Sequence, residues 1–85
     1  GKVEGVINSI MVGHRMLNIS RGPIEKWNRP AATLNFLVDE NIDMSALEET
    51  MSLEFRFNLV NGDFVINEII SSTMPASNNG SSSND

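Results

Sequence analysis

The fold is decided by the stretch Leu17-Asn-Ile-Ser-Arg-Gly-Pro-Ile-Glu-Lys-Trp-Asn-Arg-Pro-Ala-Ala-Thr-Leu-Asn-Phe-Leu-Val38. It contains two runs in which apolar residues alternate with others, and a loop between them that Gly22-Pro23 and Pro30 restrict at both ends. Side chains of a β-strand alternate between two faces, so every second residue of each run faces the same side. One face therefore carries Leu17, Ile19 and Arg21 in the first run, and Ala32, Leu34, Phe36 and Val38 in the second. The pattern predicts two strands that pack on one core.

The β pattern continues on both sides of this stretch. β-Branched residues are frequent in residues 3–10, and the following Val12-Gly13-His14-Arg15 is typical of a turn in which Gly13 supplies the backbone freedom. Clear alternation runs from residue 51 to 60, and Asn61-Gly62 predicts a two-residue hairpin because both residues tolerate a positive φ. The strands that we predict are residues 3–10, 16–20, 32–38, 51–60 and 63–70.

A short helical turn is expected between the third and fourth strands. Asp43 is a plausible N-cap, since its carboxylate can accept the free N–H groups of a turn through Met44 to Glu49 that buries Met44 and Leu47. The chain therefore predicts an all-β fold, a small five-stranded OB-like closed barrel with one helical turn. The barrel is expected to occupy residues 1–72, and residues 73–85, rich in Ser, Asn and Gly, to form a disordered tail.

Composition narrows the classes of function. The 85 residues suffice for one domain, and a net charge of −5 argues against a nucleic-acid partner. The sequence shows no apolar run long enough to span a membrane and no signal-peptide pattern at its start. Its first residues, Gly1-Lys-Val-Glu, are typical of an excised fragment. The single His has no Ser or Cys nucleophile near it, so we expect no enzyme. With no Cys, a soft-metal site would have to use the five Met and one His.

Several motifs resemble the periplasmic copper/silver-binding domain of the CusF type. They are Ile19-Ser-Arg-Gly-Pro-Ile24, a Trp-containing loop, Pro30-Ala-Ala-Thr-Leu-Asn-Phe36, Met44-Ser-Ala-Leu47, Leu53-Glu-Phe-Arg-Phe57, Asn61-Gly62 and Phe64-Val-Ile66. The resemblance covers roughly Lys2 to Ile70. It implies the OB-like barrel and a turn at Thr50-Met51, where the family usually has Gly-Asp.

This family includes free metallochaperones and C-terminal domains of the adaptor (membrane fusion) subunits of tripartite metal-efflux pumps. The resemblance therefore implies a periplasmic domain of an adaptor in a copper/silver-type heavy-metal efflux system. The partners that it implies are efflux-pump components, namely the inner-membrane transporter and the rest of the adaptor. The isolated domain is expected to be a monomer that does not insert into the membrane.

In the family, one His and two Met side chains hold Cu(I) or Ag(I), and a Trp ring lies against the ion. Carried over by position, the His matches Arg21, the Trp matches Arg29, and the two Met match Ala32 and Leu34. None of the four can donate an electron pair to a soft cation, so the resemblance implies a lost metal site and no cofactor. In the simplest interpretation Ala32 and Leu34 complete the core, while both arginines reach solvent.

Two alternatives stay open. Met11, His14 and Met16 place three soft donors within six residues, and together they could bind Cu(I) or Ag(I) in a working metal-transfer domain. Arg21 and Arg29 could instead dock an acidic or anionic partner in a protein-interaction module. Trp27 lies two residues before the family's Trp position and is expected to cover the end of the barrel by packing.

Overall fold

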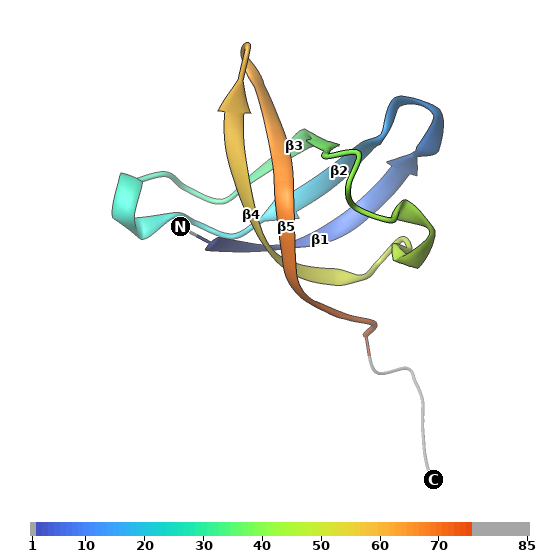
Figure 1. The fold of residues 1–85 in the computed structure, drawn as a ribbon. Coiled ribbons are helices and arrows are strands. Elements are labelled where there is room, and N and C mark those ends of the chain that lie inside the picture. The colour runs from blue at the N-terminus through green and yellow to red at the C-terminus, as the bar shows by residue number, and fades with distance from the viewer. Residues whose placement is uncertain (1, 76–85) are drawn as a thin grey trace, which may run out of the picture.

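The structure is a computed structural model that describes residues 2–75 (Figure 1). Five strands and three single 3-10 turns (η) make up the described chain. In order they are β1 (Lys2–Met11), η1 (Val12–His14), β2 (Met16–Arg21), η2 (Glu25–Trp27), β3 (Ala32–Val38), η3 (Met44–Ala46), β4 (Ser52–Val60) and β5 (Asp63–Thr73). The predicted tail beyond residue 75 lies outside the described residues, so the division into barrel and tail stays a prediction.

The strands close into one barrel in the order β1-β2-β3-β5-β4, with β4 also paired to β1. Neighbouring strands are antiparallel except β3 and β5, which run parallel through Leu37 opposite Val65 and Val38 opposite Ile66. Bulges shift the register between Ile7 and Ser9 in β1 and at two places between β4 and β5. Bulges let a strand bend, as closing a sheet of so few strands requires. The predicted five-stranded OB-like closed barrel is confirmed.

The strand boundaries differ from the prediction only at the ends. β1 and β2 are slightly longer than expected, β3 is as predicted, β4 begins at Ser52, and β5 continues to Thr73. The predicted turn after β3 is present as η3 but ends at Ala46 and not at Glu49, whereas η1 and η2 were not predicted. In the first hairpin the left-handed residue is Arg15, with φ 49°, and not Gly13. A single 3-10 turn leaves no periodic apolar signal, which is why the sequence did not indicate η1 and η2.

The core lies inside the barrel and consists of inward-facing residues of the strands and of three residues from the segment between β3 and β4. Its buried members are Val3, Ile7, Leu17, Ile19, Phe36, Val38, Met44, Leu47, Met51, Leu53, Phe55 and Ile66. Phe36 and Phe55 have no exposed surface, and their rings meet edge to face with centroids 5.3 Å apart. Such aromatic contacts add to the free energy gained by removing apolar surface from water. Met44 and Leu47 are buried as predicted, although Leu47 follows η3 in extended backbone.

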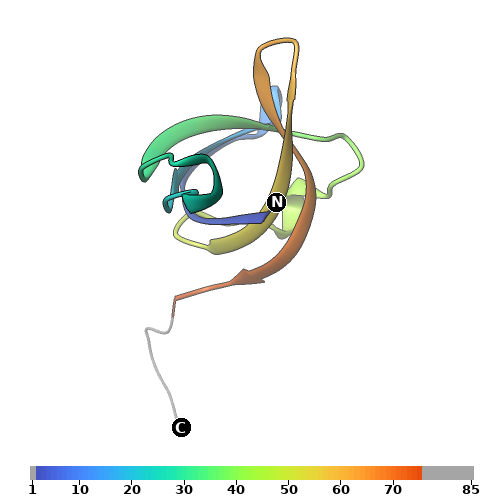
Figure 2. The ribbon, with the colours of Figure 1, turned by 90° about the vertical axis from the view of Figure 1, so that its left-hand side faces the viewer.

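Two loop regions lie at opposite sides of the barrel. In Figure 1 the η2 loop is on the left, while the η1 and η3 turns are on the right; Figure 2 looks onto the side with the η2 loop in front. The β4–β5 hairpin extends beyond the barrel and turns at Asn61-Gly62, which have φ of 52° and 87°. Both positive values confirm the hairpin turn predicted at this dipeptide. Among the described residues, no helix has the length and apolar character needed to cross a membrane.

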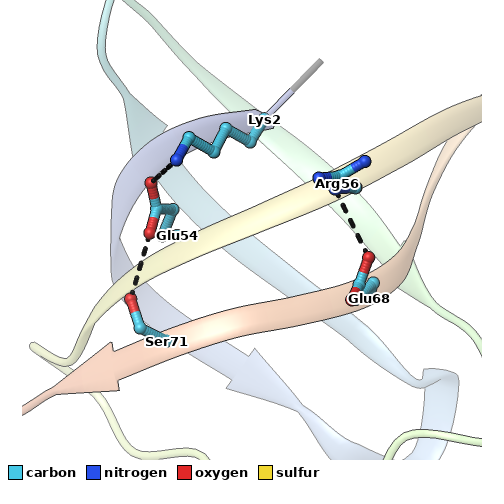
Figure 3. A network of polar contacts seen from close by, with 5 residues as sticks. All are labelled: Lys2, Glu54, Arg56, Glu68 and Ser71. Atoms are coloured by element: carbon cyan, nitrogen blue, oxygen red, sulfur yellow. Dashed lines mark hydrogen bonds and ion pairs between the residues drawn. The ribbon is translucent and has the colours of Figure 1, made fainter.

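Polar side chains on the outside of β4 pair with those of its neighbours (Figure 3). Lys2 Nζ lies 3.1 Å from a carboxylate oxygen of Glu54, and Arg56 Nε lies 3.4 Å from one of Glu68. Ser71 Oγ donates a 3.4 Å hydrogen bond to Glu54. Exposed ion pairs of this kind contribute little stability. They are the only ion pairs that the structure records between residues 2 and 75, so the other cations of that segment have no carboxylate partner there.

Candidate functional site

A cavity of about 750 Å³ opens at the end of the barrel beside the η2 loop. Its walls come from the last residue of β2, the η2 loop, β3 as far as Phe36, the second half of β4 and the start of β5. The lining residues are Arg21, Ile24, Trp27, Arg29, Pro30, Ala32, Leu34, Phe36, Phe57, Asn58, Leu59 and Phe64. The four positions that the family resemblance singled out, Arg21, Arg29, Ala32 and Leu34, therefore lie around one cavity.

Arg21 is the charged group inside this site. It ends β2 on the same inward face as Leu17 and Ile19, so strand alternation points it into the barrel. Its Nη1 donates hydrogen bonds to the carbonyl oxygens of Gly22 and Pro30, both at 3.0 Å. The residue is only 9% exposed. The expectation that Arg21 reaches solvent was therefore wrong, because the two carbonyl groups replace water around part of the guanidinium.

The loop that carries Trp27 and Arg29 is held by its own backbone. Ile24 and Arg29 exchange hydrogen bonds as an isolated antiparallel bridge, with N–O distances of 2.9 and 3.0 Å. Between them Asn28 takes the left-handed conformation with φ 54° and ends the η2 turn. Asn adopts this conformation more readily than most residues. Arg29 is exposed, as expected, at the mouth of the cavity.

Trp27 lies at the mouth and is half exposed. Its ring meets Phe57 edge to face, with centroids 6.2 Å apart and an interplanar angle of 87°. The contact agrees with the packing role expected of Trp27, although half of its surface still faces water. Phe57 continues the contact inward to Phe36 and Phe64, with centroid distances of 5.5 and 5.4 Å.

Phe57 and Phe64 pack against the core without belonging to its buried members. Both are only partly buried and form walls of the cavity. Leu34 and Ala32 are partly buried as well, so they line the cavity and do not fill it. Strand alternation identified the face to which these side chains belong. It carries no information on whether the end of the barrel is filled or hollow, because that depends on side chains brought in by the loops.

The donor chemistry of the cavity is unsuited to a soft cation. Ala32 and Leu34 are hydrocarbon, and a guanidinium offers no lone pair. Among the described residues that line the cavity, Asn58 has the only side-chain oxygen, and none carries sulfur, imidazole or a carboxylate. Cu(I) and Ag(I) bind thioether, thiolate and imidazole ligands in proteins. Between residues 2 and 75, no group of three or more His, Cys, Asp or Glu side chains is placed to hold a metal ion.

The second candidate group, Met11, His14 and Met16, lies in the first hairpin, away from this cavity. Met11 and Met16 are directly opposite each other in the last pair of β1 and β2, so their side chains share the outer face of the sheet. Both are partly buried. His14 is exposed in η1 between them. The structure thus brings the two methionines together and leaves the histidine on the surface beside them.

Arg15 is a residue that sequence reasoning did not single out. Its Nη2 donates 2.7 Å hydrogen bonds to the carbonyl oxygens of Asp39 and Ile42, and its Nε donates to that of Val38 at 3.3 Å. It thereby joins the β1–β2 turn to the segment after β3. A basic residue in a turn gives no sequence signal for such a role, because its partners are backbone atoms more than 20 residues away.

Asp43 caps η3 as predicted. Its Oδ1 accepts hydrogen bonds from the backbone N of Ser45 at 2.9 Å and from Ser45 Oγ at 2.7 Å. These two bonds, the side-chain one first, lower the pKa of Asp43 from its ordinary value because they favour the charged form, and the positive charge of Arg15 lowers it further. The cap lies on the side of the barrel opposite the η2 loop, so it supports the fold and not the cavity.

Fold and cavity together define the chain as a small OB-like closed barrel with a ligand-sized cavity at one end. The family model described as copper binding periplasmic protein CusF matches residues 1–70. The chain belongs to this family. None of the curated proteins matches its sequence.

Solved structures of CusF share the fold. The structure of apo-CusF residues 6–88 from Escherichia coli aligns with a TM-score of 0.73 and 22% identity over 85% of this chain and 86% of the other. That of CusF-Ag(I) residues 10–88 from Escherichia coli gives 0.73 and 22% over 85% and 90%. A crystal structure of Ag(I)CusF gives 0.72 and 22% over 81% and 92%. At this identity the comparison shows the barrel alone.

Proposed function

We propose that the chain is the CusF-type domain of a periplasmic adaptor subunit in a copper/silver-type efflux system, and that its family metal site is lost. Its role is then structural or pump-contacting, with neither catalysis nor a resident metal. Membership of a family named for a copper-binding periplasmic protein supports the periplasmic setting. The observation that carries the loss of the site is the gathering of Arg21, Arg29, Ala32 and Leu34 around one donor-poor cavity.

Electrostatic repulsion lowers the affinity for a metal ion further, beyond the effect of the missing donors. A guanidinium at about 5 Å repels a monovalent cation by about 3 kcal/mol when the effective dielectric constant is about 20. This corresponds to more than a hundredfold in affinity. Arg21 is fixed by its hydrogen bonds to Gly22 and Pro30, so it does not readily turn away from the cavity. A metal at the family position would thus face a repulsive charge where the family supplies a ligand.

Calorimetry with Ag(I) tests the lost site. The unmodified domain should show no binding at the cavity, whereas a variant that restores the four family residues should show one site. Binding of Ag(I) by the unmodified domain that is abolished by substitutions in the cavity would overturn the proposal.

Contact with the pump is expected at the mouth of the cavity. Trp27 and Arg29 are exposed there next to Leu59, and these residues offer the apolar and cationic surface that partner proteins often bind. A photo-crosslinking residue at position 27, in cells that carry the complete gene, should form adducts with the inner-membrane transporter or another part of the adaptor. The same residue at position 67, on the outer face of β5, serves as the control. Equal adduct patterns at the two positions would exclude a specific contact by this face.

A working metal-transfer domain is the second candidate function. It is favoured by the direct pairing of Met11 and Met16 across β1 and β2, next to His14 in η1. Two thioethers and an imidazole suit Cu(I) and Ag(I). This candidate uses the opposite end of the first hairpin from Arg21, so it does not depend on the state of the cavity. Titration with Ag(I) distinguishes it through the residues whose signals move.

A further inference from the structure

We propose that the cavity binds a small organic monoanion, namely a carboxylate attached to an aromatic or aliphatic body. This goes beyond the proposed function, which concerns the loss of a metal and contact with a pump. The two are also tested separately, since binding of an organic anion says nothing about affinity for Ag(I).

The size and lining of the cavity fit a small ligand. Its volume of about 750 Å³ lies within the range of roughly 300 to 1,000 Å³ found for small-molecule sites. Such sites are mostly apolar, with a few polar groups that fix the orientation of the ligand. Here the walls are formed mainly by aromatic and aliphatic side chains, and the charged side chains are Arg21 and Arg29.

The environment of Arg21 is the reason why we expect the ligand to carry a negative charge. A guanidinium has five N–H donors, and within residues 2–75 the structure records protein acceptors only for Nη1. Between residues 2 and 75 no carboxylate forms an ion pair with it, although the residue is about nine-tenths buried. Two neutral carbonyl groups leave its net charge uncompensated. A buried cation with donors left over is the group that a carboxylate binds most favourably, through charge-assisted hydrogen bonds.

The side chains that line the cavity indicate what the rest of the ligand should be. Trp27 and Leu59 are 50% and 66% exposed at the mouth, and Phe57 and Phe64 are partly buried deeper in. A ligand with an apolar body would remove this surface from water, whereas a bare inorganic anion would leave it exposed. A multiply charged anion is disfavoured twice, by the apolar walls and by the net charge of −5 of the chain. The occupant that satisfies all groups is an amphipathic monocarboxylate.

Trp27 is the only tryptophan of the chain, so its fluorescence reports binding directly. The probes are 3-phenylpropionate, its neutral analogue 3-phenylpropionamide, and acetate. We expect saturable change with 3-phenylpropionate, an affinity about tenfold or more weaker for the amide, and no saturation with acetate. Equal affinities for the carboxylate and the amide would overturn the role of Arg21. No saturation with either would overturn the site.

Three variants locate the binding. Arg21→Met should bring the affinity for 3-phenylpropionate to within about twofold of that for the amide, because the charge is gone. Ala32→Phe should block the cavity while Arg21 stays in place, and should abolish binding even if Arg21→Met fails to fold. Arg56→Met removes an exposed cation from the outer face of β4 and should leave binding unchanged. Unaltered binding by Ala32→Phe would contradict the proposal.

A protein segment is the competing occupant. An acidic peptide that saturates the Trp27 signal, under conditions in which 3-phenylpropionate does not, would assign the cavity to protein docking and reject the small anion. Saturation of the Trp27 signal by 3-phenylpropionate, without saturation by that peptide, is the result that supports the proposal.

Discussion

Arg21 Nη1 donates a 3.0 Å hydrogen bond to the carbonyl oxygen of Pro30, across the loop that separates β2 from β3. The same nitrogen donates to the carbonyl of Gly22 at the start of that loop. One guanidinium therefore ties together the two ends of a segment that also closes through the Ile24–Arg29 bridge. Arg21, which we predict to stand at the family's histidine position, thus has a structural role of its own.

Replacing Arg21 by Lys should loosen this loop. An ammonium keeps the charge but cannot hold both carbonyls in the fixed geometry of a guanidinium, so we expect the free energy of unfolding to fall by about 1 kcal/mol. Amide hydrogen exchange at Ile24 and Arg29 should accelerate more than that of the barrel strands. Arg56→Lys, at an exposed ion pair on β4, is the matched control and should change neither quantity. Unchanged exchange at Ile24 in Arg21→Lys would show that the bridge does not need the guanidinium.

Much of the fold could be predicted from the sequence because strand alternation and turn residues are local signals. Leu17, Ile19 and Phe36 are buried as their alternation required, and Asn61-Gly62 turns the hairpin. The cavity could not be predicted in this way. Its volume depends on how the η2 loop is held beside the barrel, which involves the bridge between Ile24 and Arg29 and the hydrogen bond from Arg21 to Pro30. Strand alternation in the sequence predicted that Arg21 lies on the inner face, but it did not indicate that the guanidinium stays buried and does not reach solvent.

Thr50 occupies a backbone conformation suited to glycine. Its φ is 72°, which costs a β-branched residue roughly 1–2 kcal/mol. Its N–H nevertheless donates a 2.8 Å hydrogen bond to the carbonyl oxygen of Ile7, so the conformation is fixed by the barrel. Thr50→Gly should raise the free energy of unfolding by up to about 1 kcal/mol, since the entropy cost of glycine offsets part of the gain.

Urea denaturation followed by circular dichroism measures this change. Thr33→Gly is the matched control, because Thr33 lies in the extended backbone of β3 and is exposed. There glycine should lower the free energy of unfolding by about 0.5–1 kcal/mol, and loss of the hydrogen bond between Thr33 Oγ1 and Ser20 Oγ adds to this fall. A loss of stability in both variants would mean that the turn at Thr50 is not strained.

The cap of η3 should make stability depend on acid pH. The pKa of Asp43 is lowered in the folded protein by hydrogen bonds from Ser45, so this contribution to stability is present above the unfolded value of 3.8. It is lost as the pH falls through the lower pKa of the folded state. Asp43→Asn removes the charge and keeps a side-chain oxygen. Its urea midpoint should therefore fall less than that of the unmodified protein from about pH 5 to about pH 2.

Ser45→Ala provides a second variant for the same effect. It removes the side-chain hydrogen bond, which is the largest cause of the lowered pKa, while Asp43 stays in place. The pH dependence should shrink in this variant as well. An undiminished fall of the midpoint in both variants would assign the acid sensitivity to other carboxylates.

A separate prediction concerns binding of Ag(I) by the two methionines of the first hairpin. If Met11, His14 and Met16 hold Ag(I), the methyl signals of both methionines should shift on titration, and the shifts should vanish in His14→Ala. Met74, which is 44% exposed beyond β5, reports non-specific contact between Ag(I) and a lone thioether. Shifts of equal size at Met11 and Met74, or unchanged shifts in His14→Ala, would exclude a site built on His14.

Restoring the family ligands should create the metal site on this barrel. The variant Arg21→His, Arg29→Trp, Ala32→Met and Leu34→Met removes two positive charges and supplies an imidazole and two thioethers. Leu34→Met nearly conserves volume. Ala32→Met would normally risk overpacking by 1–3 kcal/mol, but Ala32 borders the cavity, so we expect a cost below about 1 kcal/mol. Calorimetry should detect one Ag(I) site in this variant and none at the cavity of the unmodified protein.

A variant with Arg29→Trp, Ala32→Met and Leu34→Met that keeps Arg21 distinguishes the effect of the missing donors from the effect of charge repulsion. It supplies both thioethers and the Trp ring but leaves the guanidinium that Gly22 and Pro30 hold in the cavity wall. About 3 kcal/mol of repulsion predicts an affinity for Ag(I) more than a hundredfold below that of the fourfold variant, beyond the loss of the imidazole. Equal affinities would show that the charge of Arg21 is screened or displaced. Strong binding by the unmodified domain, surviving the loss of Met11, His14 and Met16, would mean that the four positions are not those of the family's ligands.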